Sequence, residues 1–211
     1  MKRFDLSLYL VLDPDLCAGT GMVETARLAV AGGATMVQLR DKRGGTSRLV
    51  ETGLALKEVL LGTDAMLIVN DDVEAAVAIG ADGLHIGQDD MEPAAARAMI
   101  GADMILGLSA ETEALAAAID PGIVDYAGIG PIFATSTKTD HKQPIGFDGL
   151  ARLIKAAPVP TVAIGGLKSE HVASVFAAGA DGLAVVSAIC GTPDPKAATL
   201  RIAEEIRKAR R

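Results

Sequence analysis

The sequence predicts an α/β fold, a single (β/α)8 TIM barrel that spans residues 1–211. Eight short apolar runs alternate with eight segments that carry apolar residues at helical spacing. Variants of one short unit recur at 31–39, 78–86 and 177–185, with a weaker version at 125–129, so the unit marks every second strand. Polar residues also gather where the apolar runs end, which is where barrels of this kind carry their active sites.

The first part of the chain contains five of the expected strands and five helices. Each strand is a short, nearly continuous apolar run, as is typical of parallel strands covered on both faces. Pro93 near a first helical turn and Ser109 as a cap support two of the helix starts. The strands are expected at 7–12, 35–40, 66–69, 83–86 and 104–108, and the helices at 22–31, 46–61, 73–79, 93–100 and 111–119.

The remainder supplies three more strands and three helices. Ser169 is the expected cap of the seventh helix. Residues 131–147 show neither helical nor strand periodicity and are predicted to form a mobile loop, since loops of this length in compact domains are commonly lids or binding loops. The strands are expected at 125–129, 161–164 and 182–186, and the helices at 148–157, 170–177 and 195–210.

An open doubly wound sheet is the main alternative fold. Such sheets usually have fewer strands and a glycine-rich turn after the first one. Here the first strand leads instead into AspProAspLeu at 13–16, which favours the barrel.

Charge and cysteine content limit the function classes. A net charge of −7 argues against a general binder of nucleic acids or anionic membranes, although a local basic pocket for a small anion stays open. Cys17 and Cys190 lack the spacing of a metal or redox motif, so buried or idle thiols in a reducing compartment are expected. No signal peptide or membrane-spanning run is visible, and a cytoplasmic protein is expected.

Two groups of residues suit anionic ligands. The 131–147 loop places the hydroxyls of Thr135, Ser136 and Thr137 beside Lys138, although a plain surface loop would read similarly. The expected seventh and eighth strands end in 165–166 (GlyGly) and 186–187 (ValSer), where barrels often bind phosphate through backbone amides. The alternative for the glycine pair is a tight turn.

Two aspartates at neighbouring strand ends indicate a metal. Asp71 and Asp90 follow the third and fourth strands, and their carboxylates would repel each other unless a cation or proton intervened. Mg²⁺ fits, because it typically takes one or two carboxylates together with water and phosphate oxygens. Either aspartate alone could instead cap a helix, the role for which Asp72 and Asp89 are the better candidates.

The second strand ends in three polar side chains that alternate along the chain. Gln38, Arg40 and Lys42 would share one face, plausibly the barrel interior, where the two cations could hold a diphosphate opposite the metal. Taken alone, they would more often form a solvated strand end. His85 is expected inside the barrel with a structural role, and no nucleophile triad is present.

These strand ends, taken together, resemble those of the thiamine phosphate synthases over nearly the whole chain. The matching segments are GlnLeuArgAspLys (38–42), AsnAsp (70–71), HisIleGlyGlnAspAsp (85–90), GlyLeuSer (107–109), GlyProIlePheAlaThrSerThrLys (130–138), IleGlyGly (164–166) and ValValSerAlaIle (185–189). The chain departs from the family at Ala134 and Ser136, where Pro and Thr are common. This departure puts the rate of loop closure in doubt more than the chemistry.

The resemblance implies a transferase that joins 4-amino-5-hydroxymethyl-2-methylpyrimidine diphosphate to a thiazole phosphate and releases thiamine phosphate and diphosphate. It implies Mg²⁺ held by Asp71 and Asp90, and a catalytic set of Arg40, Ser109 and Lys138, with Ser109 on the pyrimidine. The residues implied to hold the pyrimidine diphosphate are Gln38, Leu39, Arg40, Asp41, Lys42, Asn70 and Lys138. The implied thiazole phosphate residues are Thr135, Ser136, Thr137, Gly166, Val186 and Ser187.

Two other functions remain on the same barrel. A thiazole tautomerase would have no need of a diphosphate and metal site, and a non-catalytic phosphate-binding barrel would not need the aspartates with Lys138. The expected partners are small-molecule substrates, without nucleic acid or membrane. A homo-oligomer is compatible with the family, since such enzymes are often dimers or trimers.

Overall fold

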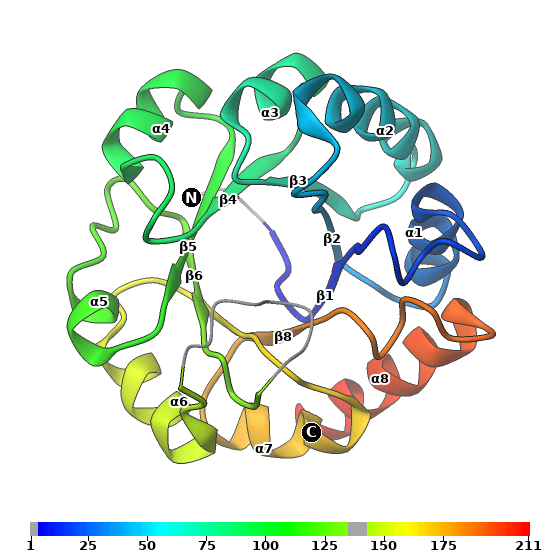
Figure 1. Cartoon of the computed structure of the whole chain (residues 1–211). Helices are drawn as coiled ribbons and strands as arrows, with labels where there is room; N and C mark the ends of the chain where they lie inside the picture. The colour runs from blue at the N-terminus through cyan, green and yellow to red at the C-terminus, as the bar shows by residue number, and fades with distance from the viewer. Residues whose placement is uncertain (1–3, 135–142) are drawn as a thin grey trace.

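The computed structural model describes residues 4–134 and 143–211, and its strands close into a barrel. Eight parallel strands pair in chain order, and β8 pairs with β1 to complete the ring. The helices surround the strands as an outer layer (Figure 1). This closed topology confirms the predicted TIM barrel and excludes the open sheet.

The elements follow the predicted alternation closely. The strands are β1 (Leu8–Val11), β2 (Met36–Leu39), β3 (Met66–Asn70), β4 (Gly83–Ile86), β5 (Ile105–Ala110), β6 (Tyr126–Ile129), β7 (Thr161–Ala163) and β8 (Gly182–Val185). The helices are α1 (Met22–Ala31), α2 (Gly45–Leu60), α3 (Val73–Ile79), α4 (Pro93–Ile100), α5 (Glu113–Ala117), α6 (Gly146–Ala156), the 3₁₀ turn η1 (Ser169–His171), α7 (Val172–Ala177) and α8 (Pro195–Ala209).

Two of the predicted helix caps are wrong. Ser109 pairs with Gly128 in the β5–β6 ladder, so its backbone is still extended and cannot begin a helix. Thr112 caps α5 instead, through a 3.2 Å hydrogen bond that its hydroxyl accepts from the Leu115 amide. Ser169 is the first residue of η1 rather than a cap, because Lys168 holds the N-cap position.

Of the two aspartates proposed as helix caps, one is a cap and the other is not. Asp72 caps α3 by accepting a 2.8 Å hydrogen bond from the Ala75 amide, as predicted. Asp89 does not cap α4, because that helix begins at Pro93 with Glu92 at the N-cap position.

The strands separate two apolar cores. The outer core fills the space between the sheet and the helices with small aliphatic side chains such as Leu39, Leu84 and Ala127. The inner core lies within the barrel, where Tyr9 and Tyr126 pack with apolar residues of β2, β3, β5, β7 and β8. Each fully buried aliphatic or aromatic side chain stabilises the fold by roughly 1.5–3 kcal/mol. The barrel is therefore a packed core, and ligands can enter only at its ends.

The N-terminal segment adds to the inner core. Phe4 and Leu6 pack with it, and the Phe4 ring lies 5.8 Å from the ring of Tyr126. Figure 1 shows this dark blue segment inside the ring of strands. The described part of the chain holds no helix with the length and apolarity that a membrane crossing requires.

Candidate active site

Two carboxyl groups meet at the ends of β3 and β4. Asp71 and Asp90 hydrogen-bond to each other, and Asp90 Oδ2 also accepts a 2.7 Å hydrogen bond from the Gly87 amide. Burial, together with the neighbouring Asp90, raises the pKa of Asp71 to about 6. Burial opposes ionisation of Asp90 as well, but the hydrogen bonds from Asp71 and Gly87 outweigh it and lower that pKa. Two carboxyl groups this close disfavour simultaneous ionisation, and a divalent cation between them would relieve their repulsion.

The backbone holds Asp71 in an uncommon conformation. Its φ is 63°, in the left-handed region that residues other than glycine rarely adopt. The Asp71 amide donates a 2.9 Å hydrogen bond to the carbonyl oxygen of His85, which ties the end of β3 to β4. Strained residues of this kind concentrate at functional sites.

A cation that follows β2 lies next to this pair. Lys42 Nζ lies 3.4 Å from Asp71 Oδ2, with half of the lysine side chain exposed. Arg40 Nε is buried and has no hydrogen-bond partner in the described part of the chain. An unpaired buried guanidinium donor is costly, so an anionic ligand at this position would satisfy it. The structure thus brings Lys42 together with Asp71, as the sequence predicts, while the roles of these residues stay predictions.

Two side chains of the same segment do not enter the site. Leu39 is fully buried in the outer core, because alternation along β2 points it toward the helices. Asp41 is buried beneath its own turn, where Oδ1 accepts 3.0 Å hydrogen bonds from the amides of Arg43 and Gly44. Their predicted ligand roles can therefore be fulfilled only by backbone groups, and the Asp41 carboxylate shapes the turn instead.

A chain of hydrogen bonds crosses the barrel interior and reaches two predicted pyrimidine residues. Gln38 Nε2 donates to the Tyr9 hydroxyl at 2.9 Å, and the two tyrosine hydroxyls are 3.0 Å apart. The Tyr126 hydroxyl lies 2.9 Å from His85 Nδ1, and His85 Nε2 lies 2.9 Å from Ser109 Oγ. All five side chains are buried. The prediction that His85 lies inside the barrel is confirmed.

Reasoning from the sequence missed both tyrosines of this chain. Tyr9 and Tyr126 lie in apolar runs and were treated as ordinary strand residues. They are the only tyrosines in the sequence, and a buried phenol usually requires a hydrogen-bond partner. That requirement is the sequence signal that could have indicated a buried hydrogen-bond network at these two tyrosines.

The ends of β7 and β8 present backbone amides that have no partner among the described residues. Among the backbone hydrogen bonds of the described residues, none is donated by Gly165, Gly166 or Ser187. Gly165 and Gly166 have φ of 95° and 69°. A side chain on Gly165 would lie 2.6 Å from the Pro131 Cα, so glycine is required where this turn packs on the loop after β6. Val186 is half-buried and Ser187 exposed, and both are open to an anion through their backbone.

Both described ends of the long loop are fixed to the barrel. Ile132 and Phe133 donate hydrogen bonds to the carbonyl groups of Ile164 and Gly165, at 2.9 and 3.1 Å. The Phe133 ring also packs 5.5 Å from that of Phe147 and 4.7 Å from that of His171. The predicted ligands Thr135, Ser136, Thr137 and Lys138 lie outside the described residues. Their roles and the mobility of the loop stay predictions.

Asn70 is the last residue of β3 and is half-buried beside Asp71. Its register partner is His85, so its side chain belongs to the same end of the barrel as the carboxyl pair. No group of three or more metal-ligating side chains occurs among the residues that the structure describes. A metal here would therefore use the two aspartates and complete its coordination with water or substrate oxygens.

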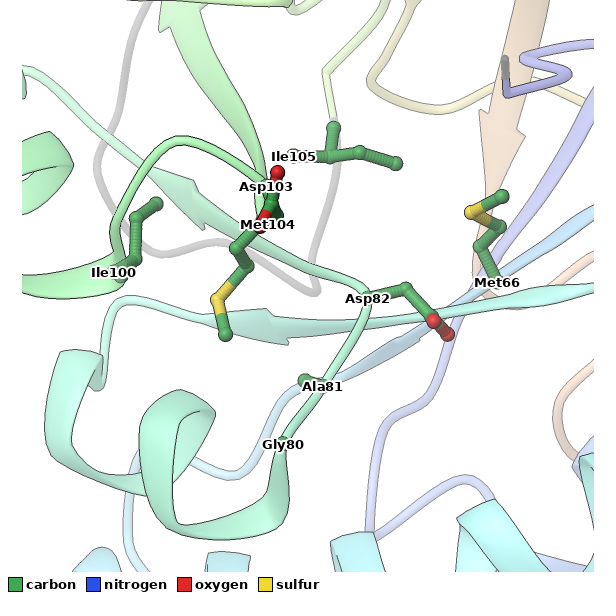
Figure 2. A pocket seen from close by; sticks show the side chains of 8 residues that line it. All are labelled: Met66, Gly80, Ala81, Asp82, Ile100, Asp103, Met104 and Ile105. Atoms are coloured by element: carbon green, nitrogen blue, oxygen red, sulfur yellow. The ribbon is translucent and has the colours of Figure 1, made fainter. Parts of the chain in front are cut away.

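A pocket of about 370 Å³ lies at the other end of the barrel, at the N-terminal ends of β3, β4 and β5 (Figure 2). The described residues that line it include no lysine or arginine. Its carboxylate Asp82 accepts a 2.8 Å hydrogen bond from the Leu67 amide and thereby stabilises the strand ends. This pocket has none of the groups that an anionic substrate needs. The residues that line it are Met66, Gly80, Ala81, Asp82, Ile100, Asp103, Met104 and Ile105.

Comparison with known proteins places this arrangement in a family. The sequence model of the thiamine monophosphate synthase family matches residues 8–189. Thiamine-phosphate synthase of Psychrobacter sp. is 47% identical over 203 residues, which cover 94% of this chain and 95% of that protein. The enzyme of the same name from Xanthobacter autotrophicus is 49% identical over 209 residues, with 99% of both chains covered.

Solved structures agree. Thiamine phosphate pyrophosphorylase from Pyrococcus furiosus superposes with a TM-score of 0.88 at 33% identity and covers 97% of this chain and 96% of its own. A 3-hexulose-6-phosphate synthase, at 18% identity and a TM-score of 0.69, shares the fold. The barrel, its paired carboxyl groups and these full-length similarities show that the chain belongs to the thiamine monophosphate synthase family of transferases, as its strand-end motifs predict.

Proposed function

We propose that this enzyme displaces diphosphate from 4-amino-5-hydroxymethyl-2-methylpyrimidine diphosphate with the ring nitrogen of a thiazole phosphate. The observation that carries this proposal is the close pair of carboxyl groups Asp71 and Asp90 beside Lys42, together with the buried Nε of Arg40, which has no partner among the described residues. Two carboxyl groups and two cations suit a metal-bound diphosphate, in which both signs of charge need a partner.

The two substrates would bind to different residues at this end of the barrel. Arg40, Lys42 and Asn70 would hold the diphosphate, while Gln38 and Ser109 would contact the pyrimidine. The open amides of Gly166 and Ser187, with Val186 between the strand and the turn, would hold the thiazole phosphate. From the sequence alone, Lys138 would add a charge to the diphosphate, and Thr135, Ser136 and Thr137 would add hydroxyls to the thiazole phosphate.

The donor set fits Mg²⁺. Asp71 and Asp90 would supply two carboxylate oxygens. Burial and the neighbouring Asp90 raise the pKa of Asp71 despite the nearby Lys42, so a divalent cation would favour the ionised pair. When bound, Mg²⁺ would neutralise negative charge that develops on the departing diphosphate. The protein groups that share this task are Arg40 and Lys42.

The reaction depends on positioning of the two substrates more than on acid–base catalysis. Diphosphate leaves readily once its charge is balanced, and the pyrimidine methylene can carry positive charge with help from the amino group. Such a dissociative displacement requires little general base, and the thiazole nitrogen is already a nucleophile. The protein would align the two substrates and exclude water that could trap the cation. The loop after β6 would supply that exclusion by closing over the site.

The alternatives are less well supported by the same residues. A thiazole tautomerase needs no diphosphate site, so it gives no reason for an Asp71 with a left-handed backbone whose carboxyl group lies beside that of Asp90. A non-catalytic phosphate-binding barrel could use the amides after β7 and β8, but it would leave the Arg40 Nε unpaired.

A steady-state assay tests the proposal. Purified protein should release diphosphate only when both substrates and Mg²⁺ are present, and it should form thiamine phosphate in equal amount. Chelation of divalent cations should remove the activity, and added Mg²⁺ should restore it. Isomerisation of the thiazole phosphate alone would support the tautomerase. Phosphate binding without turnover would support the non-catalytic barrel.

A further inference from the structure

The donor groups of the buried chain from Gln38 to Ser109 favour one direction for its hydrogen bonds. A phenol donates one hydrogen bond, and an amide nitrogen only donates. Because Gln38 Nε2 donates to the Tyr9 oxygen, the Tyr9 proton is available to the Tyr126 oxygen. The Tyr126 hydroxyl then donates its hydrogen bond to His85 Nδ1, 2.9 Å away. Burial raises the pKa of both phenols above its ordinary value, so both remain protonated donors.

The tautomer of His85 sets the direction of its hydrogen bond with Ser109. A neutral imidazole that accepts at Nδ1 carries its proton on Nε2. His85 Nε2 therefore donates to Ser109 Oγ across 2.9 Å. The hydroxyl proton of Ser109 is then left to donate beyond the chain, and the amide oxygen of Gln38 is left to accept.

The two ends consequently offer opposite hydrogen-bonding groups. An aminopyrimidine presents amino protons and ring nitrogens with lone pairs, so it can satisfy one acceptor and one donor. A 4-oxopyrimidine presents a carbonyl oxygen and a ring N–H, which reverses the pattern. Reversing the chain would change both ends together, because each link donates only in one direction.

We propose that Tyr9, Tyr126 and His85 are positioning residues that hold Gln38 as an acceptor and Ser109 as a donor toward the aminopyrimidine. This inference deepens the proposed function and rests on it for the identity of the ligand. The chain lies among apolar side chains of the inner core, where a hydrogen bond left unmade is costly. That cost opposes independent rotation of the Gln38 amide or the Ser109 hydroxyl. The buried side chains of the barrel would thereby determine which pyrimidine the two groups can bind.

The tautomer of His85 gives a test that does not depend on catalysis. Nitrogen NMR of protein with ¹⁵N-labelled histidine should show His85 as the neutral form protonated at Nε2, with its signal identified by loss in His85→Gln. Tyr126→Phe removes the donor to Nδ1 and should produce a mixture of tautomers. Tyr9→Phe keeps that donor and should retain the Nε2 tautomer. An Nδ1-protonated His85 in the wild type, or no change in Tyr126→Phe, would overturn the inference.

Kinetics test the consequence for specificity. Both Tyr126→Phe and Tyr9→Phe should lower kcat/KM for the pyrimidine diphosphate roughly ten-fold, while KM for the thiazole phosphate stays unchanged. They should also reduce discrimination against the 4-oxopyrimidine diphosphate by a similar factor. Equal effects on both substrates, or unchanged discrimination, would show a structural role only.

Thr161→Val is the matched control. It removes a buried hydroxyl of β7 that has no hydrogen-bond partner among the described residues, so neither the tautomer nor the discrimination should change. Failure of the proposed function would appear as a wild-type protein that forms no thiamine phosphate. The tautomer measurements would still decide whether the chain has the inferred direction.

Discussion

Asp71→Asn should lower kcat/KM by about 100-fold or more, since it removes one of the two carboxylates proposed to hold the metal. The same variant should be more stable than the wild type when no metal is present. Asparagine tolerates the left-handed backbone at φ 63°, and it removes the repulsion between two neighbouring carboxylates. The loss of activity would then be separate from any loss of folding.

The stability gain should depend on pH in a defined sense. The folded-state pKa of Asp71 is raised from 3.8 to about 6, so the folded protein binds a proton there that the unfolded chain has released. Wild-type stability from this group is present at low pH and is lost as the pH rises through about 6. Asp71→Asn should therefore gain about 1–2 kcal/mol at pH 8, after allowance for partial exposure, and the gain should shrink as the pH falls toward 4.

Asp89→Asn provides the control, because it removes one negative charge from the exposed loop that carries Asp90 and leaves both carboxyl groups of the pair in place. Thermal melts with a chelator present, together with initial rates at several Mg²⁺ concentrations, make the measurement. Wild-type activity with an unaltered Mg²⁺ requirement in Asp71→Asn would contradict the metal assignment. A variant less stable than the wild type at pH 8 would contradict the account of the carboxyl pair.

Gly165→Ala should destabilise the protein by about 3 kcal/mol and weaken thiazole phosphate binding. Its φ of 95° disfavours any side chain, and the new methyl group would lie 2.6 Å from the Pro131 Cα. A loss of this size lowers Tm by roughly 6–12 °C in a domain of about 200 residues. Because the turn must move away from Pro131, its amides would shift, and KM for the thiazole phosphate should rise about ten-fold.

Gly62→Ala separates the effect of a positive φ from the effect of the close contact with Pro131. Gly62 also has a positive φ, 78°, but nothing lies within 4 Å of the position that a side chain would occupy. It should cost only about 1 kcal/mol and leave both KM values unchanged. If Gly165→Ala were no more destabilising than Gly62→Ala, the close packing between the β7 turn and the loop after β6 would not carry the effect.

The sequence by itself determined the barrel and most of the polar residues at its catalytic end. The alternation of runs and periodic segments leaves few arrangements that can bury both faces of so many strands. The residues that follow each strand are then brought to one end by topology alone. Asp71, Asp90 and Lys42 could for this reason be grouped before any coordinates were known.

The direction of individual side chains was decided only by the tertiary structure. Strands buried on both faces are apolar throughout, so periodicity does not show which residues point inward, and a shift of one residue exchanges the two faces. Periodicity therefore does not distinguish Tyr9 and Tyr126 from their aliphatic neighbours, and the local sequence predicts a helix cap at Ser109. Strand pairing places their hydroxyls in one chain with Gln38 and His85, across separations in sequence that no local pattern encodes.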